Sequence, residues 1–151
     1  MTETIITVIT ILSVLIALAT LISGVNAYKN QMNAQLFLEF TKRFEEVMQS
    51  FPKNAWSARL DIDGVIPPKS KGLSLSVLRY LNLCSEEYYL YEKRWLNKDI
   101  WKIWEGELIR TLQTPLFIRE WKTLSGEFEA YPAFIKYVNE KQSEINISSR
   151  K

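Results

Sequence analysis

The chain has 151 residues, of which 24% are charged, 47% hydrophobic and 13% aromatic. This length and composition predict one compact folded domain and exclude a disordered chain. A net charge of +2 gives no support for nucleic-acid binding. The chain has no histidine, the commonest acid–base group and metal ligand, and only one cysteine, Cys84. An intramolecular disulfide and a thiolate metal cage are therefore excluded.

The N-terminal segment is apolar and long enough to cross a membrane. No charged residue occurs from Thr4 to Val25, and as a helix this run is about 33 Å long, against a hydrocarbon core of about 30 Å. A cleaved signal peptide is the alternative, and residues 25–27 loosely resemble its cleavage site. Such a peptide needs positive charges before a shorter apolar run, whereas the only charged side chain here is Glu3. The sequence therefore predicts an uncleaved transmembrane anchor over residues 1–28.

The charges that flank this anchor predict its orientation. No lysine or arginine precedes the apolar run, and Lys29, Lys42 and Arg43 follow it. Because positive flanking charges stay on the cytoplasmic side, the domain after the anchor is expected in the cytoplasm and the N-terminus outside.

Small residues recur along one side of the anchor at spacings of three and four. In lipid, helices associate where small residues let their backbones approach and hydroxyl groups bond across. The alternative is a monomeric anchor in which these residues have no role. The candidate helix-association seam, for a homodimer or for another membrane protein's helix, consists of Thr10, Ser13, Ala17, Thr20 and Gly24.

The anchor helix is predicted to continue into the domain, because no glycine or proline occurs between Val25 and Pro52. An apolar stripe at helical spacing follows, made of Phe37, Phe40, Phe44, Val47 or Met48, and Phe51.

Pro52 should end this helix, a short helical turn is expected over residues 54–60, and residues 61–72 are expected to form a loop. Within that loop, residues 61–64 (DIDG) resemble the start of a calcium loop but lack its later ligands, so no metal site is predicted.

Four further helices are predicted from caps and apolar spacing. The first, capped by Ser74 or Ser76, runs to about Trp95 and is apolar enough to be the central helix. Asn97 caps the second, and Thr114-Pro115 begins the third because proline suits the first helical position. The fourth begins at Tyr131-Pro132.

The predicted fold class is therefore all-α. It is an N-terminal transmembrane helix followed by a small cytoplasmic helical bundle of four to five helices. Residues 1–28 form the anchor, residues 29–145 the helical domain and residues 146–151 a polar tail.

Carboxylates are the strongest candidates for chemistry. Glu86 and Glu87 lie in the middle of the central helix, and Glu92 follows more than one turn later. A partly buried glutamate can have a raised pKa and act as an acid or a base. The structural alternative, which we favour, is ion pairing between helices with Arg79, Arg94 or Arg110. A dinuclear carboxylate site normally needs histidines, which are absent.

Three other features of the sequence are candidate functional sites. The segment 105–107 is predicted to be a solvated edge with a close helix contact at Gly106. Cys84 lies on the apolar stripe and is predicted to be a buried hydrophobic residue. The aromatic-rich middle of the chain is either a partner-binding groove or, as we favour, core filling. Its members are Tyr88, Tyr89, Tyr91, Trp95, Trp101, Trp104 and Trp121.

The pattern of helices and aromatic residues resembles that of uncharacterised bacterial membrane-anchored helical proteins that carry a domain of unknown function. The resemblance covers most of the chain and rests on residues 78–82 (LRYLN), Glu86-Glu87, residues 96–101 (LNKDIW), Trp104 and Trp121. It implies a location in the bacterial inner membrane. It implies no activity, so no functional residue is carried over from it.

Three functions are compatible with these features of the sequence. The first is a non-enzymatic interaction module, tethered so that its helical domain meets a partner at the membrane. The second is a regulatory or accessory subunit of a membrane complex, assembled through the transmembrane helix. The third, a carboxylate-dependent enzyme, has little support. The expected partners are the lipid bilayer and either a second copy or another membrane protein; no nucleic acid, metal or cofactor is expected.

Overall fold

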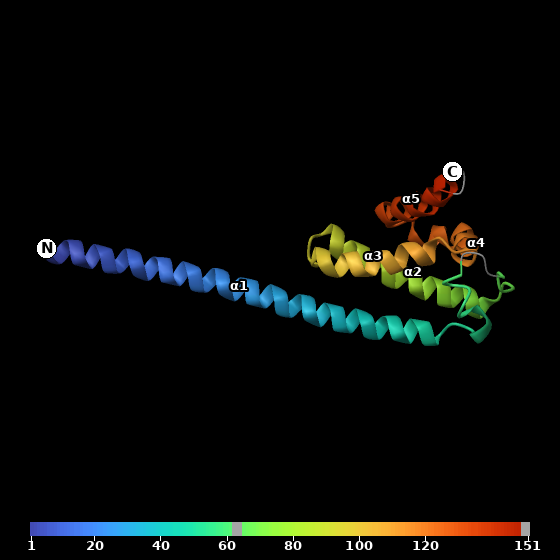
Figure 1. Cartoon of the computed structure of the whole chain (residues 1–151), viewed down its shortest axis with the longest axis horizontal. Coiled ribbons are helices and arrows are strands. Elements are labelled where there is room, and N and C mark those ends of the chain that lie inside the picture. The colour runs from blue at the N-terminus through green and yellow to red at the C-terminus, as the bar shows by residue number, and fades with distance from the viewer. Residues whose placement is uncertain (62–64, 149–151) are drawn as a thin grey trace. The chain divides into compact units, whose positions relative to one another are not determined.

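The computed structural model describes residues 1–61 and 65–148. All regular structure in these residues is helical, which confirms the all-α prediction. The chain divides into two compact units, Met1–Leu38 and Glu39–Lys151. The elements in chain order are α1 (Thr2–Gln49), η1 (Lys53–Ala55), α2 (Lys71–Glu92), α3 (Lys98–Leu112), α4 (Pro115–Leu124), η2 (Ser125–Phe128) and α5 (Pro132–Ser148) (Figure 1).

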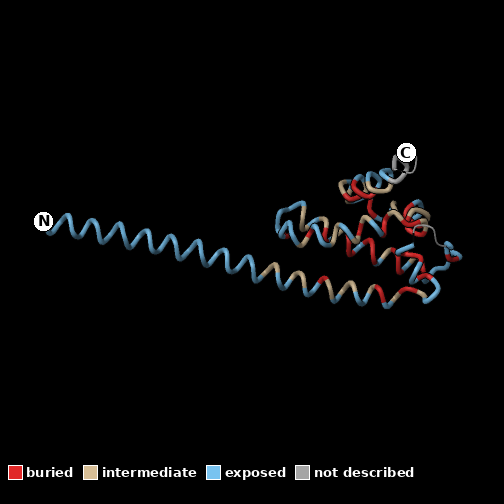
Figure 2. The backbone as a smooth tube through the Cα atoms, in the orientation of Figure 1, coloured by how far each residue is buried: buried red, intermediate tan, exposed pale blue. Residues whose placement is uncertain are grey.

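The first unit is the N-terminal part of α1. Every residue from 1 to 31 is exposed, as the uninterrupted pale tube in Figure 2 shows. Its most apolar 18-residue window has a mean hydropathy of 2.8, and none of that window is buried. This helix is thus long and apolar enough to cross a membrane.

The second unit, which we call the helical domain, is built around α2. This helix contacts α3, α4 and α5, as expected for the central helix of the bundle. Its buried apolar side chains are Leu73, Val77, Tyr80, Leu81, Leu83 and Cys84. The predicted apolar stripe is confirmed here from Phe40 onward, because Phe40, Met48 and Phe51 are buried and Phe44 and Val47 pack against the core. Its first member, Phe37, lies in the other unit.

Within the helical domain, the last turns of α1 lie antiparallel to α2. Ser50 Oγ lies 3.2 Å from Ser76 Oγ near the start of α2, and the Phe44 and Tyr80 rings are 6.3 Å apart. Arg43, earlier in α1, meets Glu86, later in α2. The C-terminal end of α2 therefore lies at the end of the domain where the chain enters at Glu39.

Two predicted helix starts are confirmed by their caps. The Asn97 side chain accepts a hydrogen bond from the Asp99 amide, 2.7 Å away, at the start of α3. Thr114 caps α4, with Pro115 at the first helical position. Both caps accept amide hydrogen bonds that the first turn of a helix leaves unpaired.

The predicted cap of α2 is wrong. The cap is Ser70, whose backbone is extended and whose side chain accepts from the Leu73 amide. Ser74 and Ser76 lie inside the helix, and Ser76 is buried with its hydroxyl donating to the Ser50 carbonyl 2.7 Å away. Gly72, read as a loop residue, belongs to the first helical turn.

The end of α2 also differs from the prediction. The helix ends at Glu92, because Arg94 takes a left-handed conformation with a φ of 59°. This reversal turns Leu96 into the core and leaves Trp95 56% exposed. At the C-terminus, α5 continues to Ser148, so the predicted polar tail from Asn146 begins inside a helix.

Candidate functional site

Glu86 forms an ion pair, but not with a predicted partner. The Arg43 guanidinium donates two hydrogen bonds to its carboxylate, one of them 2.9 Å long from Nη2 to Oε1. Both side chains are partly exposed, so the pair contributes little to stability. The prediction of Arg79, Arg94 or Arg110 was wrong because the last turns of α1, far away in sequence, pack beside α2.

Glu92 is exposed and accepts a hydrogen bond from the Tyr131 hydroxyl, 3.2 Å away. This contact joins the end of α2 to the residue before α5. It is a surface contact between helices, in a position that offers no buried acid or base.

Glu87 is the unusual carboxylate. It is only 7% exposed, and no hydrogen bond or ion pair reaches it in the described part of the chain. Burial, and then the negative charge of Glu107, raise the pKa of Glu87 to about 8, against the opposing effect of Arg43. The side chain is therefore mostly protonated at neutral pH, as a buried carboxyl without a cationic partner should be.

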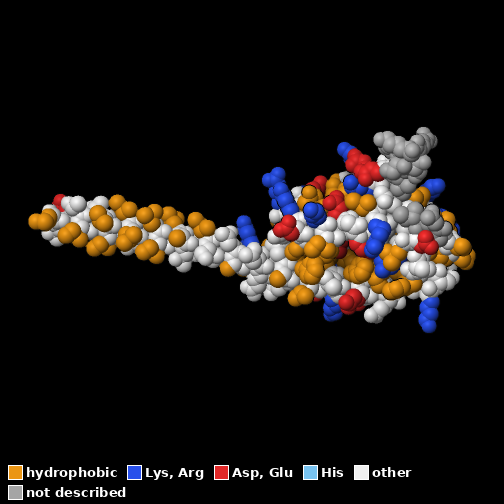
Figure 3. Space-filling model, viewed as in Figure 1, with side chains coloured by type: hydrophobic (Ala, Val, Ile, Leu, Met, Phe, Trp, Pro, Cys, Tyr) orange, Lys and Arg blue, Asp and Glu red, His pale blue; other side chains and the backbone are white. Residues whose placement is uncertain are grey.

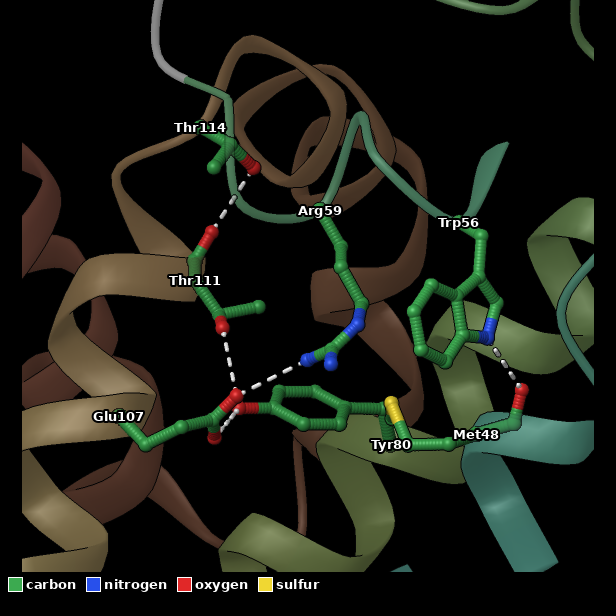
Figure 4. A network of polar contacts seen from close by, with 7 residues as sticks. All are labelled: Met48, Trp56, Arg59, Tyr80, Glu107, Thr111 and Thr114. Carbon is green, nitrogen blue, oxygen red and sulfur yellow. Dashed lines mark hydrogen bonds and ion pairs between the residues drawn. The ribbon is translucent and has the colours of Figure 1, made fainter. Parts of the chain in front are cut away.

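Glu107, whose charge acts on Glu87, is the centre of a polar network (Figure 4). The Glu107 carboxylate accepts from the Tyr80 hydroxyl at 2.7 Å, the Thr111 hydroxyl at 3.1 Å and Arg59 Nη1 at 3.0 Å. These donors come from α2, from α3 and from the turn after η1. Segment 105–107 is partly solvated, as predicted, since Gly106 is exposed and the Glu107 side chain is 28% exposed, but Glu107 also holds these contacts between elements. At Gly106 an added Cβ would meet no atom within 4 Å, so the predicted close contact is absent.

Arg59 connects this network to the segment between α1 and α2. Its side chain is 9% exposed, and its guanidinium lies over the rings of Phe44 and Trp56, at 5.7 Å and 5.5 Å from their centroids. The Trp56 indole in turn donates to the Met48 carbonyl, 3.3 Å away (Figure 4). A buried cation held by a carboxylate and two aromatic faces fixes this turn on the bundle.

A second buried carboxylate, Glu120, fixes the next part of the same segment. It is 1% exposed. Its oxygens accept from the Ser74 hydroxyl at 2.7 Å and from Arg119 Nε at 2.9 Å. Arg119 also donates to the Pro67 carbonyl. The connection between α1 and α2 is thus held at Arg59 and again at Pro67.

The chemistry available in this interior is limited. Burial raises the pKa of Tyr80 and that of Cys84 well above their ordinary values, so both remain protonated. The prediction of a buried Cys84 is confirmed, since this residue is 2% exposed. Glu107 is occupied by its three donors. A hollow of about 380 Å³ beside Glu86 is lined by neither Glu87 nor Glu107. These features support a structural network better than an acid–base site.

The aromatic-rich middle is mainly core. Trp101 and Trp121 are 3% and 4% exposed, and Tyr88, Tyr91 and Trp104 pack against the core. This confirms core filling for five of the seven residues. Tyr89 and Trp95 are the exceptions, since they are 41% and 56% exposed.

The candidate seam lies on the exposed surface of α1. The hydroxyls of Thr10, Ser13 and Thr20 each donate to the carbonyl four residues earlier, at 2.9 Å. Because these hydroxyls already have acceptors, packing at Ala17 and Gly24 would provide most of any association. The calcium-like segment 61–64 lies largely outside the described residues, and the described residues contain no cluster of three possible metal ligands.

Comparison of the chain with protein-family models, with curated protein sequences and with solved structures finds no match. The function is therefore inferred from the geometry of the two units.

Proposed function

We propose that this chain is a single-pass membrane protein whose helical domain is a non-enzymatic interaction module in the bacterial cytoplasm. The observation that carries the proposal is the apolar surface of α1, whose most hydrophobic 18 residues have a mean hydropathy of 2.8 and no burial. A core helix of a soluble protein buries such residues, and a continuous exposed apolar surface of this length needs lipid around it.

The helical domain supports the second part of the proposal. Two of its carboxylates, one half-buried and one buried, hold helices and the connection between α1 and α2 through Arg59, Ser74 and Arg119. An anchor would help such a domain to bind, because it raises the effective concentration of the domain near partners at the same membrane.

The anchor and its orientation are tested with a reporter fused after Lys151. We expect cytoplasmic reporter activity, because the flanking positive charges begin at Lys29. We also expect extraction from membranes only by detergent and a mature mass of 17.7 kDa. A reporter active only in the periplasm would contradict the orientation, and a mature chain beginning near Tyr28 would show that the anchor is cleaved.

The alternative is an accessory subunit assembled through the anchor, and the exposed seam is the observation that favours it. We expect the double variant Ala17→Leu, Gly24→Leu to weaken self-association in a membrane two-hybrid assay, because larger side chains hold the two backbones apart. Ala19→Leu, on the other side of the helix, is the control and should associate as the wild type does.

Equal signals from wild type and double variant would show that the seam does not mediate self-association. Replacing residues 1–28 with an unrelated transmembrane segment then separates the two functions. Partners crosslinked in native membranes should be retained if the helical domain binds them, and lost if the anchor does.

A further inference from the structure

The turn between α2 and α3 has an unusual backbone conformation and leaves the Trp95 side chain exposed. Trp95 and Leu96 both donate their amides to the Leu90 carbonyl, at 2.9 Å and 3.2 Å. Arg94 makes the reversal with a φ of 59°, a conformation that helix ends usually assign to glycine. An arginine is thus held at this turn despite the steric cost of the left-handed conformation.

The exposed rings pack edge to face and form a small aromatic surface. Tyr89 and Trp95 are 41% and 56% exposed, and their centroids are 6.0 Å apart at an interplanar angle of 85°. The Lys93 ammonium lies 5.4 Å from the centroid of the Tyr89 ring. Aromatic rings with one wet edge, next to lysine and arginine, are typical of the interface between a membrane and water.

The same turn carries positive charge that the domain does not neutralise. Lys93, Arg94, Lys98 and Lys102 are exposed, and none of them forms an ion pair within the described residues. Only two carboxylates lie in this stretch, Glu92 and Asp99, and Glu92 accepts from Tyr131. A hollow of about 600 Å³ beside the turn includes Arg94, Asn97 and Lys98 in its lining. In Figure 3, basic and hydrophobic side chains lie on this end of the domain, with acidic side chains among them.

The position of the turn within the helical domain indicates which kind of partner binds there. Because the last turns of α1 lie antiparallel to α2, the end of α2 lies where the chain enters at Glu39. The proposed anchor precedes Glu39, so this is the end of the domain attached to the membrane segment. A surface with unpaired cations and exposed rings at this end matches a lipid surface with anionic headgroups.

We infer that the α2–α3 turn and the two helix ends beside it, residues 89–102, dock on an anionic membrane surface. The inference rests on the proposed membrane anchor. Tyr89 and Trp95 enter the headgroup region, while Lys93, Arg94, Lys98 and Lys102 meet lipid phosphates. The turn would then hold the tethered domain against the bilayer in an orientation set by lipid charge.

Tryptophan quenching by brominated lipids tests this docking in the full chain. All five tryptophans lie in the helical domain and none in the apolar run, so quenching reports on that domain alone. The chain is reconstituted into vesicles of brominated phosphatidylcholine, with or without brominated phosphatidylglycerol. We expect stronger quenching in the anionic vesicles, and loss of the difference in about 1 M salt, where the Debye length is about 3 Å.

Two matched pairs of variants locate the contact. Trp95→Phe should remove most of the additional quenching, whereas Trp56→Phe, which removes a tryptophan that is 52% exposed elsewhere, should retain it. The additional quenching should also fall in the double variant Lys98→Gln, Lys102→Gln. It should not change in the control double variant Lys122→Gln, Lys136→Gln, whose lysines lie on α4 and α5.

The outcomes separate this inference from the anchor on which it rests. A chain that fails to remain with phosphatidylcholine vesicles after alkaline washing contradicts the anchor. A chain that remains, yet is quenched equally in both kinds of vesicle, overturns the docking inference. An equal loss of the additional quenching in the Trp95 and Trp56 variants overturns the docking inference as well. The exposed rings would then be a candidate surface for a protein partner.

Discussion

Trp101→Ala is expected to lower the free energy of unfolding of the helical domain by about 3–5 kcal/mol, the usual cost of removing a buried tryptophan side chain. Trp101 is 3% exposed and stacks on Tyr91, with 4.7 Å between the centroids and 12° between the planes. It also packs near Tyr88 and Tyr137, at 5.9 Å and 6.1 Å. The substitution removes these ring contacts and leaves a cavity in the core.

Trp104→Ala is the matched comparison, one turn further along α3. Trp104 is only half-buried, and its ring lies 5.4 Å from that of Phe40. We expect a loss of about 1–3 kcal/mol, because part of this side chain is in water in both states. Urea unfolding of the full chain in detergent micelles, followed by near-ultraviolet circular dichroism, measures both. Equal losses of unfolding free energy in the two variants would contradict the deeper burial of Trp101 than of Trp104.

Glu87→Gln is expected to remove most of a pH dependence of stability. The pKa of Glu87 is about 8 in the folded chain and 4.5 in an ordinary environment. Below pH 4.5 both states hold the proton, and between 4.5 and about 8 only the folded state holds it. The unfolded state then binds fewer protons, so the free energy of unfolding falls as the pH rises through this window.

This fall amounts to at most about 5 kcal/mol, at about 1.4 kcal/mol for each unit of pKa difference. The glutamine variant should therefore gain stability relative to the wild type between pH 5 and pH 9, measured by urea unfolding. Glu86→Gln is the control, because this neighbouring carboxylate is exposed and paired with Arg43; it should retain most of the wild-type fall. A glutamine variant at position 87 with an unchanged slope would show that Glu87 is not the group responsible.

The helices and two of their caps could be predicted because these signals are local. Spacings of three and four residues place Phe40, Met48 and Val77 on buried faces, and Asn97 and Thr114 cap the helices that they precede. Ser70 was missed because several serines lie close together and Gly72 looked like the end of a loop. Trp95 was misplaced because the left-handed turn at Arg94 has no glycine to indicate it.

The polar network was not predictable from spacing. Arg59 and Glu107 are 48 positions apart, and neither lies in a pattern that distinguishes it from a solvated charge. Their pairing depends on how η1 and α3 pack around Tyr80, which is tertiary information. Glu87 was a candidate, with Glu86 and Glu92, from its place in the middle of the central helix, but the effect of Glu107 on it could be seen only in the fold. The seam stays a prediction, because no second membrane helix is present to test it.

The continuation of α1 into the core has a consequence for synthesis. The ribosome delivers Phe40, Met48 and Phe51 early, but Phe51 packs on Phe117, with 6.5 Å between their rings, and the core also needs Val138. At about 5–20 residues per second, the intervening chain takes on the order of 5 to 20 seconds to emerge. During this interval the apolar stripe that follows the exposed N-terminal part of α1 stays uncovered, so the nascent domain needs a chaperone or another apolar surface to shield it.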